Sequence, residues 1–373
     1  MEPNSPCCNT QFEEIVMDDT VLEQEIAETR NSLSTDRLDM SFGEIMSMYE
    51  RSEIIIDPEF QRLFRWTDDQ KTRFIESLLL GIPIPPIFVA EDQNGRWELV
   101  DGLQRLSTVL SFFGILKESS DKKNKKNDWV LEKGELVNAF ESYNCKKLPL
   151  KFQLNIKRAV CRVEVIKWNS KIDMRYELFN RLNTGGSPLT DQEIRNCIFR
   201  GFTSEFNDFL KRIAYHPDFM DLVVPTERQR SELYMEELVL RFASLYDNTQ
   251  NVKQNISTHM TEFMRDAVKN NDFDYEGTES LLMRVVAILK PIGRDVFRGV
   301  GGKGSFSTSL FEAITIGLAM HINHYELTGK NKIYERIEVL KTDQDFEKNM
   351  GSASNNKARI VNRVSIAEKI FKP

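Results

Sequence analysis

The sequence lacks the features that mark exported, membrane-bound or disulfide-stabilised proteins. Its first residues are acidic, with Glu2, Glu13 and Glu14 where an export signal would place basic and then apolar residues. No apolar run approaches the roughly 20 residues needed to span a bilayer. The five cysteines are an odd number and lack the paired short spacings of zinc sites or disulfide frameworks. We therefore expect a cytoplasmic protein with no membrane partner.

The chain also lacks an excess of positive charge. It has 50 Lys and Arg against 57 Asp and Glu, which gives a net charge of -7. This balance argues against a protein that coats nucleic acid non-specifically, so any DNA contact would need a local basic patch. A length of 373 residues exceeds what one compact core usually organises, so we expect more than one domain.

The hydrophobic pattern predicts a polar acidic tail over residues 1–37, a mixed domain over 38–205 and a helical domain over 206–373. In the mixed domain, helical spacing or strand-like runs occur at 42–49, 54–56, 87–90, 97–100, 103–113, 158–166, 174–182 and 190–199. Two capping boxes mark helix starts, one at Thr67 with Gln70 and one at Thr190 with Glu193. In the last domain, amphipathic segments occur at 229–246, 257–268, 278–290, 307–325 and 356–371. The predicted fold class is therefore α+β.

The residues from Asp101 to Arg105 lie where a predicted strand meets a predicted helix. Free backbone N–H groups and the positive end of the helix dipole attract an anion at such a position. Gly102 allows close approach, and Arg105 can bind two phosphate oxygens at once. This turn is a candidate phosphate site in which Asp101 could hold a metal or orient water. The alternative is a plain turn with Arg105 on a solvated helix face.

A second cluster precedes the helix that begins after Thr67. It contains Gln61, Arg62 and Arg65, and it places two cations beside aromatic rings. Two such helix N-termini could face one ligand. In the alternative interpretation, the aromatic residues of this cluster anchor the core and the arginines are simply exposed.

Four motifs in a fixed order carry a family resemblance. They are Phe60-Gln61-Arg62 to Trp66, Ile82 to Phe88, Asp101 to Thr108, and Phe179 to Gly186 leading to Leu189 to Arg195. Over roughly residues 40 to 200 the chain resembles the GmrSD-type N-terminal domain, a ParB/sulfiredoxin-like family. The resemblance implies a ParB/sulfiredoxin-like domain followed by a mainly α-helical one.

The resemblance also implies a function. In that family, a motif of the Asp-Gly-Gln-Gln-Arg type is associated with nucleotide binding and hydrolysis, often in bacterial defence against modified foreign DNA. Carried onto this chain, it implies that Asp101 and Gln104 are catalytic and that Asp101 binds Mg²⁺. The implied nucleotide-binding residues are Gln61, Arg62, Arg65, Gly102, Arg105, Asn180, Arg181 and Asn183.

The chain departs from the family motif at Leu103, which stands where the family often has its first glutamine. We expect this leucine to pack inward and the phosphate site to be retained, while hydrolysis is the open question. Restriction members of the group also carry a His-based, metal-dependent nuclease domain. Among the four histidines, His321 and His324 lie three residues apart on an apolar helix and are predicted to be partly buried. No such nuclease domain is predicted.

Three hypotheses about function follow. The first is a protein that binds and hydrolyses a nucleoside triphosphate in a DNA-related process, with DNA, a partner protein or a second copy of the chain as partners. The second is a non-enzymatic module whose pocket takes DNA phosphates or an acidic protein segment. The third is a ParB-like nuclease that uses Asp101 directly.

Overall fold

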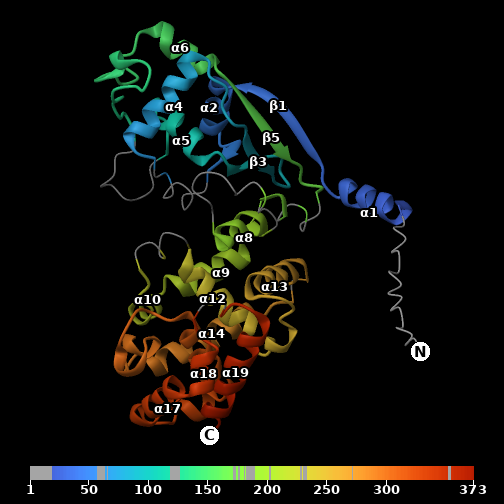
Figure 1. Ribbon diagram of the computed structural model, residues 1–373, viewed down its shortest axis with the longest axis vertical. Helices are drawn as coiled ribbons and strands as arrows, with labels where there is room; N and C mark the ends of the chain where they lie inside the picture. Colours follow the sequence, from blue (N-terminus) through green and yellow to red (C-terminus); the bar gives the residue numbers. More distant parts are fainter. Residues whose placement is uncertain are drawn as a thin grey trace, which may run out of the picture.

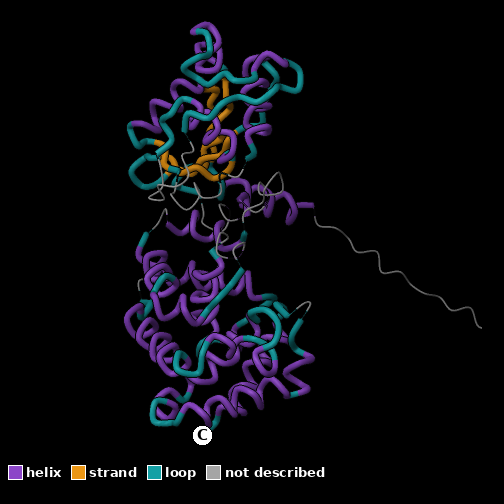
Figure 2. The backbone as a smooth tube through the Cα atoms, turned by 90° about the vertical axis from the view of Figure 1, so that its left-hand side faces the viewer, coloured by secondary structure: helices purple, strands orange, loops and turns teal. Residues whose placement is uncertain are grey.

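The computed structural model describes residues 19–56, 64, 66–117, 127–170, 174, 177–179, 181, 190–200, 203–226, 229, 233–270, 272–351 and 354–373. A sheet covered by helices comes first, and helices follow (Figure 1; Figure 2). The predicted α+β class is confirmed. Within the described ranges, no helix combines the length and the apolar character needed to cross a membrane.

The sheet has the strand order β1-β5-β3-β4-β2. Its strands are β1 (Thr35–Ser41), β2 (Ile54–Ile55), β3 (Ile87–Glu91), β4 (Trp97–Asp101) and β5 (Val160–Ile166). The β1–β5 and β3–β4 pairs are antiparallel, whereas the β3–β5 and β2–β4 pairs are parallel. The predicted hairpin of β3 and β4 is confirmed. In its turn, Asp92 Oδ1 accepts hydrogen bonds from the backbone N–H groups of Asn94 (2.8 Å) and Arg96 (2.9 Å).

In the described part of the chain, helices pack around the sheet (Figure 1). They are α2 (Phe42–Glu50), α4 (Asp68–Leu80), α5 (Leu103–Phe112) and α6 (Leu150–Arg158). The predicted capping box of α4 is present, because Thr67 Oγ1 accepts from Gln70 N (3.3 Å) and Gln70 Oε1 accepts from Thr67 N (3.0 Å). Gly81 ends the helix in the left-handed conformation with a φ of 71°. The sequence therefore fixes both ends of α4.

The helix α8 (Asp191–Arg200) joins the two parts of the chain (Figure 1). Its predicted capping box is also present, with Thr190 N donating to Glu193 Oε2 (2.7 Å) and Glu193 N donating to Thr190 Oγ1 (3.3 Å). The helix packs against α9, α12 and α13 of the helical part. Two hydrogen bonds of this contact are buried, from Asn196 Nδ2 to Glu236 Oε2 at 2.6 Å and from Asn207 Nδ2 to the Asn196 carbonyl oxygen at 3.0 Å.

The helical part contains α9 (Glu205–Ala214), α10 (Pro217–Leu222), α12 (Tyr234–Leu245), α13 (Ile256–Asn270), α14 (Tyr275–Leu289), α15 (Thr308–Met320), α16 (Ile322–Tyr325), α17 (Lys330–Thr342), α18 (Gln344–Lys348) and α19 (Lys357–Phe371). Each amphipathic segment predicted beyond residue 205 overlaps at least one of these helices. The sequence did not predict β1, α6, α9, α10, α17 or α18. Helix α1 (Asp19–Asn31) lies within the segment expected to be a tail or a short helix.

Buried charges connect three helices of the helical part. Glu312 of α15 accepts hydrogen bonds from Arg241 of α12 (2.6 Å) and Arg363 of α19 (2.5 Å). The side chains of Glu312 and Arg363 are each 1% exposed. Arg363 Nη1 also donates to the carbonyl oxygens of Asn349 (2.9 Å) and Ser354 (2.6 Å). Since a buried charge is tolerated only when it is paired and hydrogen-bonded, the packing of these helices depends on this network.

We predict that Glu312→Gln lowers the free energy of unfolding by about 3–5 kcal/mol, because it removes the carboxylate that Arg241 and Arg363 share in the core. Urea-induced unfolding followed by circular dichroism measures this change. The control is Asp345→Asn, which removes an exposed ion pair with Lys348 and should leave the unfolding midpoint nearly unchanged. Equal effects of the two substitutions would contradict the role given to the buried network.

Candidate functional site

The turn between β4 and α5 requires a glycine. Gly102 has a φ of 99° and precedes the first residue of α5, and its carbonyl accepts the first helical hydrogen bond from Leu106 N at 2.9 Å. A Cβ atom at this position would lie 2.5 Å from Ile87 Cγ2. Both the left-handed backbone and the close contact with β3 exclude other residues without rearrangement. The backbone at the start of α5 therefore packs directly against β3.

Arg105 connects this turn to the segment before β3. Its Nη2 donates to Asp101 Oδ2 (2.9 Å) and to the carbonyl oxygen of Pro86 (3.0 Å). The Arg105 side chain is 17% exposed and that of Asp101 is 42% exposed, so the alternative of an arginine on a solvated helix face does not describe Arg105. Its buried Nε has no hydrogen-bond partner in the described part of the chain, and no described group accepts from Nη1. The guanidinium is thus held in place with donor capacity remaining.

The first turn of α5 has no side-chain cap. The N–H groups of the first helical residues have no acceptor within a helix, and the positive end of the helix dipole lies at the same point. Leu103, the residue that departs from the family motif, is buried as predicted at 9% exposure. In contrast to α4, whose N-terminus is closed by its capping box, α5 presents backbone donors beside Arg105. This combination can bind an anion such as phosphate.

Gln104 brings the two predicted helix N-termini together. Its Oε1 accepts a hydrogen bond from Trp66 N at 3.1 Å, just before α4 begins. The Trp66 ring packs on Phe74 of α4 with centroids 5.6 Å apart, and Phe64 also packs against the core. These two aromatic residues are partly buried against the core, as the alternative interpretation expects of them. Gln61, Arg62 and Arg65 lie outside the described residues.

The third predicted segment is described only in part. Arg181 has an exposed side chain whose Nε donates to Glu177 Oε1 at 2.7 Å. Asn180 and Asn183 lie outside the described residues. Of the predicted site, the described structure therefore groups Asp101, Gly102, Gln104 and Arg105.

Sequence reasoning missed two backbone groups of this site, the Pro86 carbonyl and the Trp66 N–H. Pro86 and Trp66 both lie in motifs that carried the family resemblance. Those motifs were the sequence signal that these segments belong to the site. However, backbone N–H and C=O groups have the same chemistry in every residue. The residue type therefore does not reveal which backbone group forms a hydrogen bond in the site. The proline-rich segment before β3 thus contributes through its main chain, by holding Arg105.

The carboxylates of the site do not form a ready-made metal cage. Among the described residues, no group of three or more His, Cys, Asp or Glu side chains could hold a metal ion. Mg²⁺ is often bound by one or two carboxylates together with substrate phosphates, so a single carboxylate is compatible with it. Arg105 contacts only Oδ2 of Asp101. If Mg²⁺ bound here, the Asp101 carboxylate would hold it together with oxygen atoms of the substrate phosphates.

Cys161 of β5 is fully buried near this site. Burial raises the pKa of its thiol to about 11, and the backbone of Ile87 and the charge of Arg105 only partly oppose this effect. The thiol is protonated at neutral pH, so Cys161 is not a nucleophile here.

We predict that Gly102→Ala destabilises the fold by roughly 1–3 kcal/mol more than Gly81→Ala does. Both glycines have a positive φ, but the space around Gly81 is open, whereas a methyl group at Gly102 meets Ile87. Chemical unfolding of the two variants measures the difference. If both lose the same free energy, the contact with Ile87 does not constrain the turn.

Comparison with known proteins agrees with the resemblance drawn from the motifs. Residues 42–200 match the model of the GmrSD restriction endonuclease N-terminal domain. No curated protein and no solved structure was found to match the chain. The matched range begins with α2, contains the turn at Gly102 and ends with α8. Residues 42–200 of this chain are therefore similar to the N-terminal domain of GmrSD restriction endonucleases.

Proposed function

We propose that the turn at Gly102 binds the phosphates of a nucleoside triphosphate and that the chain hydrolyses this nucleotide in a process that restricts foreign DNA. The family is that of a restriction endonuclease domain, which associates the chain with defence against DNA. The observation that carries the nucleotide site is the uncapped N-terminus of α5 beside an arginine held by Asp101 and Pro86. Backbone donors, a helix dipole and a fixed guanidinium are the groups that recognise phosphate.

In this proposal the phosphates lie against the first turn of α5. Gly102 allows the left-handed turn that leads into α5, and Arg105 donates from the nitrogens not used by Asp101 and Pro86. The Asp101 carboxylate would bind Mg²⁺ or orient the attacking water, while Gln104 keeps the segment before α4 close to the ligand. That segment and the one near Asn180 would supply the remaining contacts, from Gln61, Arg62, Arg65, Asn180, Arg181 and Asn183.

A non-hydrolysing nucleotide-binding module is the second candidate. The observation that favours it is Leu103, whose side chain is buried at the first position of α5. It places an apolar group where the family often has an amide, so one polar side chain is missing from the turn. Nucleotide binding depends on the backbone and Arg105, so leucine at position 103 leaves it intact. Positioning of the attacking water, in contrast, loses a polar side chain.

We predict that Arg105→Ala weakens nucleotide binding by about 1.5–3 kcal/mol, since it removes a charge-assisted contact with phosphate. Isothermal titration with a panel of nucleoside triphosphates measures the affinity. Arg96→Ala, which removes an exposed arginine paired with Asp92 in the hairpin, is the matched control and should bind normally. Arg105→Lys tests the same contact with less loss of structure, because it keeps the charge. Wild-type affinity in both Arg105 variants would exclude this site.

We predict that Asp101→Asn lowers turnover by roughly 10² or more while it keeps nucleotide affinity within about tenfold. The assay is phosphate release with and without Mg²⁺ and DNA. If the wild type binds nucleotide but releases no phosphate, the second candidate holds, and the same substitution should leave binding equal or slightly tighter because it removes a negative charge. Undiminished hydrolysis by Asp101→Asn would exclude a catalytic role for this residue.

A further inference from the structure

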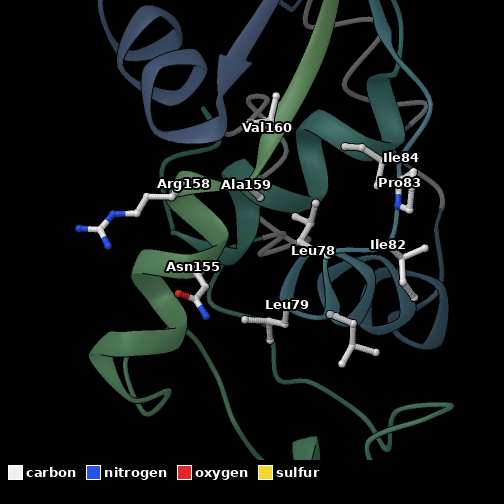
Figure 3. Close-up of a pocket in the computed structure, with 11 residues that line it drawn as sticks. Leu78, Leu79, Ile82, Pro83, Ile84, Asn155, Arg158, Ala159 and Val160 are labelled. Atoms are coloured by element: carbon white, nitrogen blue, oxygen red, sulfur yellow. The ribbon is translucent and has the colours of Figure 1, made fainter.

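A shallow groove of about 480 Å³ lies between the end of α4 and the end of α6 (Figure 3). Residues 78–84 form one wall, and Asn155 and residues 158–160 form the other. Most of its lining side chains are apolar, and several are unusually exposed for their type. Leu80 is 47% exposed, Ile82 44% and Val160 61%. Apolar side chains gathered at one hollow mark a surface suited to a partner.

Cations lie along the α6 side of this groove in a chain whose net charge is -7, and one of them, Arg158, lines it. Lys151, Lys157 and Arg158 lie on α6, and Lys147 lies just before it. All four are exposed, and none forms an ion pair with a described carboxylate. We call the groove and these four residues the basic groove. Its composition fits a partner that offers apolar side chains flanked by acidic ones.

Helix α1 has the complementary composition. From Thr20 to Asn31 every residue is exposed, and the helix projects from the side of the sheet (Figure 1). Leu22 and Ile26, one turn apart, are 54% and 57% exposed. Glu23 and Glu25 lie beside this stripe. The helix thus presents an apolar stripe with acidic flanks that the described part of its own chain does not cover.

The geometry keeps α1 away from the basic groove of its own chain. Helix α1 precedes Thr35 at one end of β1, whereas Val160 of the groove pairs with Ser41 at the other end. The seven residues of β1 span about 20 Å. The connection is fixed, because Ser34 N donates to Ser170 Oγ (3.0 Å) and Ser170 Oγ donates to Ser34 O (3.0 Å). The basic groove within reach of α1 is therefore that of another molecule.

We propose that α1 of one molecule docks in the basic groove of a second copy, and that the two copies exchange their α1 helices reciprocally. Leu22 and Ile26 enter the groove, while Glu23 and Glu25 face its cations. One short helix face is small against the roughly 1,200–2,000 Å² that stable interfaces bury. Two equivalent contacts double the area and close the assembly as a dimer with two-fold symmetry. This interface is independent of the proposed nucleotide site.

Sedimentation velocity of the full chain over a concentration series tests the proposal. We expect the wild type to dimerise. Leu22→Gln/Ile26→Gln and Lys151→Glu/Arg158→Glu should each weaken dimerisation by at least about tenfold, through lost apolar burial and lost charge complementarity respectively. Adding Glu23→Lys/Glu25→Lys to the second variant should restore the dimer, because both sides of each contact are then reversed. Lys332→Glu/Lys369→Glu, the same charge change on α17 and α19, is the control and should dimerise normally.

All substituted side chains are exposed, so circular dichroism should show unchanged folding in each variant. A wild type that stays monomeric at every concentration would overturn the proposal. So would a dimer that survives either disruptive variant, or a charge reversal that fails to restore association. If the wild type is monomeric and Lys151→Glu/Arg158→Glu lowers affinity for duplex DNA more than the control does, the basic groove is a nucleic-acid surface instead.

Discussion

The contact between Gly102 and Ile87 is the constraint on which the candidate site depends. With a Cβ excluded, β4 passes into α5 through a left-handed residue pressed against β3. This path determines where the first turn of α5 lies. Arg105 can then reach Pro86 as well as Asp101, and Gln104 can reach the backbone of Trp66. A displacement of the turn would disturb all of these hydrogen bonds together, because they depend on the same position of α5.

The elements that could be predicted are those with local signals. Both capping boxes, the hairpin turn and the amphipathic helices beyond residue 205 depend on residues close together in sequence. Strand β1 could not be predicted in this way, because Asp36, Arg37 and Asp39 make it look like a loop. Its stability comes from β5, more than a hundred residues later, where Arg162 Nε donates to Asp39 Oδ1 at 2.9 Å. Charged residues can occupy a strand when the neighbouring strand supplies the opposite charge.

The candidate site was predictable in outline, because the glycine between a strand and a helix fixes the place of the turn. Its ion pair was less evident, since Asp101 ends a strand and Arg105 lies in a helix, so helical spacing rules do not apply to the pair. The burial of Arg105 also depends on the close approach of β3, which the sequence does not encode locally. For Phe64 and Trp66 the sequence left core packing and a ligand site equally open, and the structure packs both partly buried rings against the core. The burial and pairing of Arg105 therefore depend on contacts between segments that are distant in the sequence.

The packing of α8 has a consequence for the order in which the protein forms during synthesis. The chain leaves the ribosome from its N-terminus, and the sheet can close once Ile166 has emerged. At that stage Ile194, Ile198 and Phe199 have not found their partners. Their helix is fixed only after α12 and α13 have been made, because Asn196 bonds Glu236 and Arg195 bonds Ser257. A nascent chain that has emerged as far as residue 200 therefore still exposes Ile194, Ile198 and Phe199 of its last helix, which a chaperone can bind.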